Sequence, residues 1–231
     1  AVRLAGEAAL RAGAGRVSIA THPSHASIIV ASRPELMSHA VSSPDDLEPL
    51  LAKADVVAFG PGLGQSAWAR ALYEALVNDS HPAVWDADAL NLLAAMPASA
   101  PNRVITPHPG EAATLLDTGT AAIQGDRPGA LAELAERYGG VAVLKGAGTL
   151  ISSSKLGAAL CTSGNPGMAS PGMGDVLTGM IAAFVAQGLD LETAAAAGVE
   201  AHARAGDRAA VGGERGLIAS DLLEELRAVL N

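Results

Sequence analysis

"GNPGMASPGMGDVLTGMIAAF", residues 164–184, constrains the fold most, because it passes from a glycine-rich loop into an apolar helix within a few residues. Four glycines and two prolines occupy its first eleven positions, and a single acid, Asp175, follows them. From residue 174 to about residue 187 the apolar residues recur with helical spacing, which predicts a helix. Free backbone N–H groups at such a helix start can approach a ligand closely, so this junction is a candidate anion site.

Upstream of this stretch, short apolar runs alternate with longer helical ones. The apolar runs predict strands at residues 16–21, 55–60, 82–87, 103–107 and 141–146. Apolar residues at three- and four-residue spacing predict helices at residues 1–15, 45–54, 66–78, 87–96, 110–117 and 127–140. This alternation is typical of an α/β fold with a mostly parallel central sheet and crossover helices on its faces.

The rhythm changes after Lys145. Residues 149–154 and 157–164 flank a short turn and predict a hairpin, antiparallel at one edge of the sheet. Helices are expected at 191–211 and 220–230, the last with Ser220 as its N-cap. No linker or internal repeat separates these elements, so residues 1–231 are expected to form one domain.

Composition narrows the classes of partner. The 231 residues are 49% hydrophobic and 17% charged, which argues against disorder. The formal net charge of −9 argues against DNA or RNA, because neutralising phosphates requires clustered Lys and Arg. No segment has the length and purity of a membrane span, so no membrane association is expected.

The single cysteine, Cys161, cannot form an internal disulfide, which fits a reducing compartment and a cytoplasmic location. It stands in an apolar run and is expected to pack as a small hydrophobic residue. The chain opens without a methionine, directly inside the first helical pattern. We therefore expect a fragment that lacks an upstream strand, which would leave a neighbouring strand edge exposed.

Glycine-containing loops follow three of the predicted strands: FGPGLG (59–64), TPHPGE (106–111) and KGAGT (145–149). In open α/β sheets the carboxyl ends of the strands are where ligands bind, so these loops favour a nucleotide-sized site. Neither G-x-x-x-x-G-K-[ST] nor G-x-G-x-x-G is present, so neither a P-loop nor a Rossmann cofactor site is supported.

Two charged residues in these loops each have a functional and a structural interpretation. Asp175 could take a proton from a hydroxyl as that oxygen attacks phosphorus, or it could simply cap the helix. Lys145 could clamp a nucleotide phosphate, or it could be an exposed lysine in a tight turn. From these motifs alone both alternatives stay open.

Possible metal ligands are few. Asp86, Asp88 and Asn91 stand at a strand-to-helix junction, where Asp88 is either an N-cap or a ligand of Mg²⁺ through water. His108, between two prolines, could contact a ligand, but it has no partners for metal binding. His22 and His25 are too isolated for a zinc site. No metal ligand is assigned.

Taken in order, the motifs of the chain resemble those of the ADP/ATP-dependent NAD(P)H-hydrate dehydratases over essentially its whole length. The matching motifs are GEAALRAGAG, RPELM, ADVVAFGPGLG, WDADALN, RVITPHPGEA, YGGVAVLKGAGT, GNPGMAS and GMGDVLTGMI. That family has a ribokinase-like fold, so the resemblance implies a three-layer sandwich. Its members often form the C-terminal half of a bifunctional repair enzyme.

The resemblance also implies an activity. The family restores NADH or NADPH from the S form of the hydrate by phosphorylating the hydrate hydroxyl and eliminating phosphate, which is a hydro-lyase reaction overall. ADP or ATP would be the co-substrate, with Mg²⁺ assisting. The family tends to form homotetramers, and an epimerase domain would be attached in a full-length bifunctional protein.

Site residues follow from the resemblance motif by motif. Asp175 would be the catalytic acid–base group, with Gly172 and Gly174 in the anion hole. The nucleotide would be bound by Lys145, Gly146, Ala147, Gly148, Thr149 and Gly174. The hydrate would be bound by Ala1, Gly62, Gly64, His108 and Asp175.

The chain departs from the family at two points. Pro171 stands where the family usually has glycine, which removes one N–H from the anion hole. The family's first strand and its glycine loop are absent upstream of Ala1. Two other functions therefore stay open: a small-molecule kinase of the hydroxyethylthiazole or hydroxymethylpyrimidine type, and a truncated nucleotide-binding domain without activity.

Overall fold

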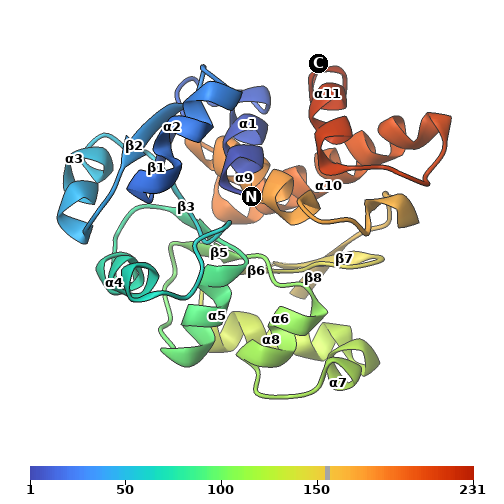
Figure 1. The fold of residues 1–231 in the computed structure, drawn as a ribbon. Helices are drawn as coiled ribbons and strands as arrows, with labels where there is room; N and C mark the ends of the chain where they lie inside the picture. Colours follow the sequence, from blue (N-terminus) through green and yellow to red (C-terminus); the bar gives the residue numbers. More distant parts are fainter. Residues whose placement is uncertain (154–156) are drawn as a thin grey trace.

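The computed structural model describes residues 1–153 and 157–231 (Figure 1). Its strands are β1 (Ser18–Thr21), β2 (Met37–Ala40), β3 (Val57–Phe59), β4 (Ala83–Trp85), β5 (Arg103–Ile105), β6 (Val141–Leu144), β7 (Thr149–Ser153) and β8 (Gly157–Cys161). Its α-helices are α1 (Val2–Arg11), α2 (Pro23–Ser32), α3 (Glu48–Leu51), α4 (Ala67–Leu76), α5 (Asp88–Ala95), α6 (Pro109–Leu115), α7 (Thr120–Gly125), α8 (Arg127–Tyr138), α9 (Met173–Ala186), α10 (Leu191–Ala209) and α11 (Ala219–Val229). Short 3₁₀ turns are η1 (Pro44–Leu47), η2 (Pro166–Met168) and η3 (Ala210–Gly212).

The central sheet has six strands in the order β3-β4-β5-β6-β7-β8. Strands β3 to β6 run parallel, and β7 pairs antiparallel with both β6 and β8. The mostly parallel sheet and its antiparallel edge hairpin are therefore confirmed. The turn expected between β7 and β8, at residues 154–156, lies outside the described residues.

The strand predicted at 16–21 does not belong to this sheet. It forms β1, which pairs in parallel with β2 in a separate two-stranded sheet. Neither β2 nor the helices α2 and α7 were expected. Strand β2 reads MSHA and has no apolar face, while α2 carries three consecutive apolar residues, Ile28 to Val30, in place of a helical stripe.

Successive side chains of the strands point to opposite faces of the sheet, and a layer of helices packs on each face. Trp85 and Ile105 pack with the residues of α4 to α8, whereas their neighbours Val84 and Val104 pack against α9 and α10. In Figure 1 these two sets of helices lie on opposite faces of the sheet. The prediction of a three-layer α/β sandwich is confirmed.

Helix α9 is fixed by backbone contacts as well as by side chains. A methyl group placed on Gly179 would lie 2.0 Å from the carbonyl oxygen of Ala5, so α1 and α9 touch backbone to backbone. On α10, a methyl group on Gly198 would lie 2.6 Å from Cγ1 of Ile181. The middle of α9 is thereby packed closely against two neighbouring helices.

Three further expectations concern the N-cap of the last helix, the single cysteine and membrane-spanning helices. Helix α11 begins at Ala219, and the carboxylate of Asp221, not Ser220, accepts the backbone N–H of Ile218 at 2.9 Å, because Ser220 already lies inside the helix. Cys161 is buried, and burial raises the pKa of its thiol, so it packs as expected and is not an activated nucleophile. No described helix is both long and apolar enough to cross a membrane.

Candidate active site

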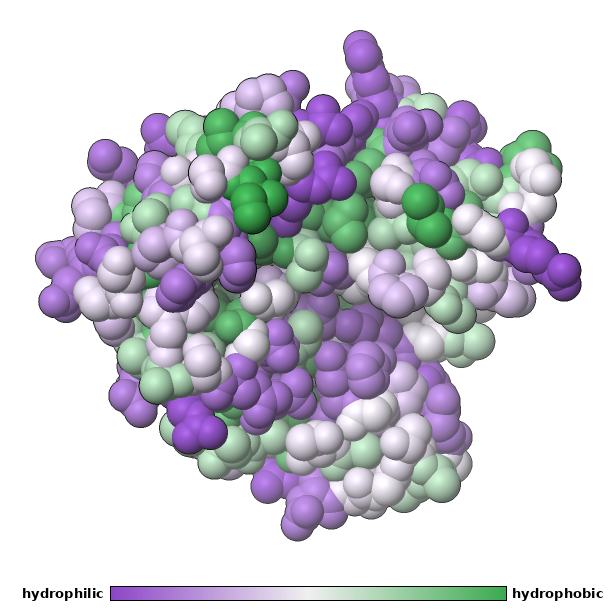
Figure 2. Space-filling model, in the orientation of Figure 1, coloured by the Kyte–Doolittle hydropathy of each residue, from purple (hydrophilic) through white to green (hydrophobic). Residues whose placement is uncertain are grey.

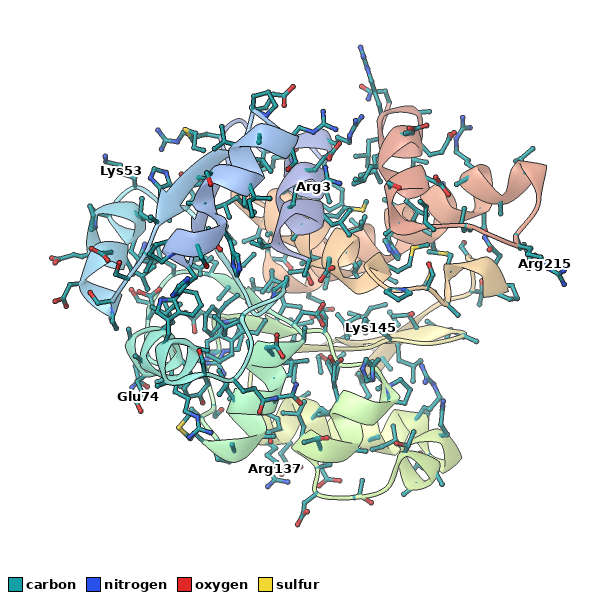
Figure 3. All side chains as sticks on the ribbon, in the orientation of Figure 1. Arg3, Lys53, Glu74, Arg137, Lys145 and Arg215 are labelled. Carbon is teal, nitrogen blue, oxygen red and sulfur yellow. The ribbon has the colours of Figure 1, made fainter. Side chains whose placement is uncertain are left out.

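The candidate site lies where the carboxyl ends of β3, β4, β5 and β6 meet the first turn of α9. Because these strands are parallel, their following loops gather at one edge of the sheet. Figure 2 shows the face of the molecule hollowed between its upper and lower halves, with hydrophilic side chains lining the middle. Lys145 lies in this region, between the two layers of helices (Figure 3).

We call one half of the site the lysine side: Lys145, Asp86, Glu111 and Thr178. Nζ of Lys145 lies 2.6 Å from Oδ1 of Asp86 and 3.7 Å from Oε2 of Glu111. The other oxygen of Asp86 accepts a hydrogen bond of 3.0 Å from the hydroxyl of Thr178 on α9. Asp86 is only 2% exposed, so this network holds a buried charge with its partners. Lys145 is not the exposed turn lysine of the alternative interpretation.

Gly174 lies directly over this ion pair. A methyl group on Gly174 would lie 3.1 Å from Nζ of Lys145 and 3.2 Å from Oδ2 of Asp86. The N-cap of α9 is Gly172, whose φ of +92° is one that glycine adopts easily, and a methyl group there would lie 2.7 Å from Cδ1 of Leu4. The ammonium group of Lys145 therefore reinforces the positive end of the helix dipole.

Asp175 lies in the first turn of α9, with a side chain that is 15% exposed. The helix start has no side-chain capping hydrogen bond, which removes the main support for Asp175 as a simple cap. Burial raises the pKa of Asp175, and the negative charge of Asp86 adds to this shift. A carboxylate with a raised pKa is a stronger base, as proton removal from a hydroxyl requires.

We call the other half the amino-terminal side: Ala1, Gly62, Gly64 and His108. A methyl group on Gly62 would lie 3.1 Å from Cβ of Ala1. The backbone N–H of Gly64 donates to Oδ2 of Asp88 at 2.8 Å. Asp88 is the first residue of α5, so it ties the GPGLG loop to this helix and is not the N-cap that the sequence suggested. Ala1 and Gly62 also border a cavity of about 230 Å³ beneath α2.

The backbone at the N-cap of α5 is strained. Ala87 takes this position with φ of 52° and ψ of −120°, a conformation that costs a non-glycine residue energy. It separates Asp86, which belongs to the lysine side, from Asp88, which holds the GPGLG loop. The strained residue thus directs two adjacent carboxylates to different halves of the site.

His108 is the N-cap of α6 and links the two sides. Its Nδ1 accepts the backbone N–H groups of Gly110 and Glu111 at 3.0 and 3.2 Å, and its own backbone N–H donates to Oε2 of Glu111 at 2.7 Å. An accepting Nδ1 means that the neutral ring carries its proton on Nε2. The side chain is 57% exposed, and its Nε2 lies 3.6 Å from Oε1 of Glu111, beyond hydrogen-bond distance, so Nε2–H is available to a ligand.

Sequence reasoning missed two residues near these loops. Arg127, on α8, donates to the carbonyl oxygens of Leu144 and Gly148, on either side of the KGAG loop. His202, on α10, lies 2.9 Å from the carbonyl oxygen of Met173, and burial lowers its pKa to about 4. Neither belongs to a local motif, and both helices carry other charged residues, so the sequence alone did not distinguish these two.

The described residues contain no group of three or more His, Cys, Asp or Glu side chains that could hold a metal ion. Both oxygens of Asp86 already accept hydrogen bonds from protein groups. This donor set fits Mg²⁺ only as an ion that keeps phosphate and water as most of its ligands, the usual arrangement for Mg²⁺ with nucleotides.

A sequence model of the family described as NAD(P)H-hydrate dehydratase matches residues 1–228. The bifunctional NAD(P)H-hydrate repair enzyme of Coxiella burnetii is 52% identical over 232 residues, which cover 100% of this chain and 48% of that protein. The ADP-dependent (S)-NAD(P)H-hydrate dehydratase of Neisseria meningitidis is 34% identical over 99% of this chain and 79% of its own length.

A similar solved structure is that of the ADP/ATP-dependent NAD(P)H-hydrate dehydratase of Bacillus subtilis, co-crystallised with ATP and Mg²⁺. It is 28% identical, with a TM-score of 0.85 over 99% of this chain and 83% of its own. The chain spans about half the length of the bifunctional relatives that it matches.

Proposed function

The chain belongs to the NAD(P)H-hydrate dehydratase family, and from this premise we propose that it dehydrates the S form of NAD(P)H hydrate with ADP or ATP as phosphoryl donor. One structural observation carries the proposal. Asp175, a base with a raised pKa, stands at the positive end of α9 beside Gly174 and the ammonium group of Lys145. A hydroxyl could lose its proton and receive a phosphoryl group at this one place.

The proposed reaction has two steps. Asp175 removes the proton of the hydrate hydroxyl, whose oxygen attacks the terminal phosphorus of ADP and releases AMP. The carbon–oxygen bond then breaks, phosphate leaves with that bonding pair, and the ring nitrogen lone pair helps to restore the double bond as a ring proton is lost. The products are NAD(P)H, AMP and phosphate, or ADP in place of AMP when ATP is the donor.

The two sides of the site would hold the two substrates. We assign the nucleotide to the loop from Lys145 to Thr149 and to Gly174, and the transferred group to the amides at Gly172 and Gly174. The start of α9 and the ammonium group of Lys145 would balance the charge that develops on the phosphoryl oxygens. Mg²⁺ bound to the phosphates would reduce their charge, with phosphate and water as most of its ligands.

The hydrate is assigned to the amino-terminal side. Ala1, Gly62 and Gly64 present backbone and small side chains, which leaves room for a ring, and Ala1 borders both the cavity and Asp175. The exposed Nε2–H of His108 would donate to a polar group of the substrate. Pro171 supplies no amide, so the amides after it would have to hold the phosphoryl group.

We further propose that residues 1–231 act as one catalytic domain, in the cytoplasm and as a homotetramer. In a longer protein this domain would be joined to an epimerase domain, in keeping with the bifunctional relatives, of which it spans about half. Light scattering of the purified protein tests the tetramer, and a monomer at micromolar concentration would contradict it.

An assay for the loss of hydrate absorbance, with ADP and ATP compared, tests the activity. We expect nucleotide-dependent formation of NADH or NADPH from the S form. A kinase of hydroxyethylthiazole or hydroxymethylpyrimidine would instead phosphorylate those alcohols and leave the hydrate unchanged. A truncated binding domain would bind ADP without turnover of any of these substrates.

Nucleotide binding has its own test. A ligand that binds only the folded state stabilises it by about 2.7 kcal/mol at a hundred times its Kd. We therefore expect millimolar ADP to raise the melting temperature of the parent protein and to raise that of Lys145→Ala less. No shift for either protein would contradict the assignment of the nucleotide to the loop after β6.

A further inference from the structure

We propose that Arg127 is a positioning residue for the nucleotide: it holds the KGAG loop, residues 145–148, in the conformation whose amides face the phosphates. The inference rests on the proposed nucleotide site and adds to it a residue from a different element. Arg127 opens helix α8, whereas the loop connects β6 to β7 on the sheet beneath that helix.

The guanidinium group bridges the loop. Its Nη2 donates to the carbonyl oxygens of Leu144 at 3.1 Å and Gly148 at 3.0 Å, and Nη1 reaches that of Lys145 at 3.4 Å. Nη1 also lies 3.3 Å from the side-chain oxygen of Gln124. In the part of the chain that the structure describes, all four partners are neutral oxygens. The charge of Arg127 therefore stays available to the loop and its ligand, and burial lowers the pKa of the guanidinium without discharging it.

These bonds fix the direction of the loop amides. Every peptide bond in the described chain is trans, so each N–H points away from the carbonyl of the preceding residue. The carbonyl of Lys145 turns toward Arg127, and the N–H of Gly146 must then point away from α8. The hydroxyl of Thr149 holds the carbonyl of Gly146 in the same way at 3.1 Å, which fixes the N–H of Ala147.

Within residues 1–153 and 157–231, neither of these two amides donates to another backbone group. Two successive N–H groups without a backbone acceptor are available to donate to an anion. The face of the sheet opposite α8 carries α9 and α10, and the ammonium group of Lys145, next to this loop, lies under Gly174. The loop amides are therefore free to donate to the phosphates, which we assign beside this loop at the start of α9.

Gly146 shows how closely the guanidinium fits. Its φ is +147°, and a methyl group on it would lie 2.9 Å from Nη1 of Arg127. A lysine at position 127 would keep the charge, but its single ammonium lacks the planar fork that spans the carbonyls of Leu144, Lys145 and Gly148. Charge and geometry can therefore be separated by substitution.

The test compares Arg127→Ala and Arg127→Lys with Arg137→Ala. Arg137 lies on the same helix and is exposed, so its removal takes away an equal charge without touching the loop (Figure 3). We expect Arg127→Ala to raise the Kd and KM for ADP about 10- to 100-fold, because hydrogen bonds from a charged group are lost. We expect kcat at saturating ADP and the KM for the hydrate to change less than threefold.

Arg127→Lys should restore little of the affinity for ADP, and Arg137→Ala should match the parent. Added methylguanidinium should recover ADP binding by Arg127→Ala but leave that of Arg137→Ala unchanged. A Kd within threefold of the parent for Arg127→Ala would overturn the inference, as would full recovery by lysine. If Arg127→Ala does not fold, Arg127→Lys is judged alone: parental affinity in a folded protein overturns the proposal, and loss of affinity supports it.

Calorimetry with ADP separates this inference from the proposed function. If the parent binds no ADP and does not consume the hydrate, the function itself is wrong. If the parent binds ADP and Arg127→Ala binds it equally well, only the role of Arg127 is wrong.

Discussion

The lysine side and the amino-terminal side of the site differ in what holds them in place. On the lysine side, buried charges are matched by hydrogen bonds among Asp86, which follows β4, Lys145, which follows β6, and Thr178 of α9. On the amino-terminal side, Gly62 lies close to Ala1, and one hydrogen bond ties the N–H of Gly64 to Asp88. Side-chain hydrogen bonds between buried charges thus hold one half of the site, and loop backbone forms the other. We expect substitutions in the two halves to differ in their cost to stability.

Asp175 stands where the two sides meet, and its substitution should have the largest effect. Asp175→Asn keeps the size of the side chain but cannot take a proton, so we expect kcat to fall about 10²- to 10⁴-fold. Stability should change by less than about 1 kcal/mol. ADP binding should persist, because a negative charge near the phosphates is lost. Steady-state kinetics and a melting scan measure these effects.

The control for Asp175→Asn is Asp190→Asn, which alters an aspartate at the start of α10, a separate helix. It should leave kcat unchanged. Near-parental activity of Asp175→Asn would make Asp175 a structural residue and would remove the link between the two sides. If that variant does not fold, Gly174→Ala tests the same junction.

Lys145→Ala should show that the lysine side bears on stability. It leaves Asp86, which is 2% exposed, without its cation, and breaking a buried pair in this way costs about 3–5 kcal/mol. Urea unfolding measures the loss. Lys53→Ala, at an exposed position, is the control and should be neutral within about 0.5 kcal/mol. A loss of unfolding free energy below about 1 kcal/mol for Lys145→Ala would contradict the view that the lysine side contributes more to stability than the amino-terminal side.

His202 extends the lysine side beneath α9 and should make stability depend on pH. Its pKa is lowered from 6.5 to about 4. Between pH 4 and pH 6.5 this histidine is therefore protonated in the unfolded chain and neutral in the native protein. Its contribution is therefore fully present above pH 6.5 and is lost as the pH falls toward 4. We expect a loss of about 1–3 kcal/mol over this window from urea unfolding at several pH values.

His202→Gln should abolish most of that slope. The exposed His25 provides the control, and His25→Gln should keep the slope of the parent. An unchanged slope in His202→Gln would show that α9 is not coupled to protonation at this position.

Asp88→Ala should have the smallest effect, because it removes a single tie on the amino-terminal side. The lost hydrogen bond to the N–H of Gly64 should cost about 1 kcal/mol. The KM for the hydrate should rise more than the KM for ADP. Asp55→Ala, an exposed carboxylate before β3, should leave both values unchanged. If Asp88→Ala lost as much unfolding free energy as Lys145→Ala, the two sides would not differ in their contribution to stability.

Local patterns predicted the parts of the fold that repeat. The strands of the central sheet are short apolar runs, and the long helices α8 to α11 have apolar residues at helical spacing. Their existence and their order along the chain could therefore be predicted from the sequence. The pairing of β1 with β2 could not, because β2 has no apolar face and its partner is decided by packing. Short elements such as α7 gain their stability from neighbours, and their own sequence indicates them weakly.

The site shows the same limit. Asp175, Lys145 and the glycines stand in or next to glycine-rich loops whose composition indicates a site, and the resemblance assigned their roles. The placement of Asp86 and Asp88 in different halves of the site depends on the strained backbone of Ala87, which the identity of an alanine does not predict. The contact of Arg127 with Gly148 joins residues 21 positions apart, and only the packing of α8 on the sheet creates it.

The backbone contact between Gly179 and Ala5 has a consequence for directed evolution. Any residue larger than glycine at position 179 must push α1 and α9 apart, and that moves the helix whose first turn carries Asp175. Libraries that randomise this contact would therefore yield mostly inactive clones, even though position 179 lies one full turn from Asp175 along the helix. Libraries should instead randomise the loops around Gly62 and Gly64. New side chains there can alter substrate choice while the helix layer keeps its geometry.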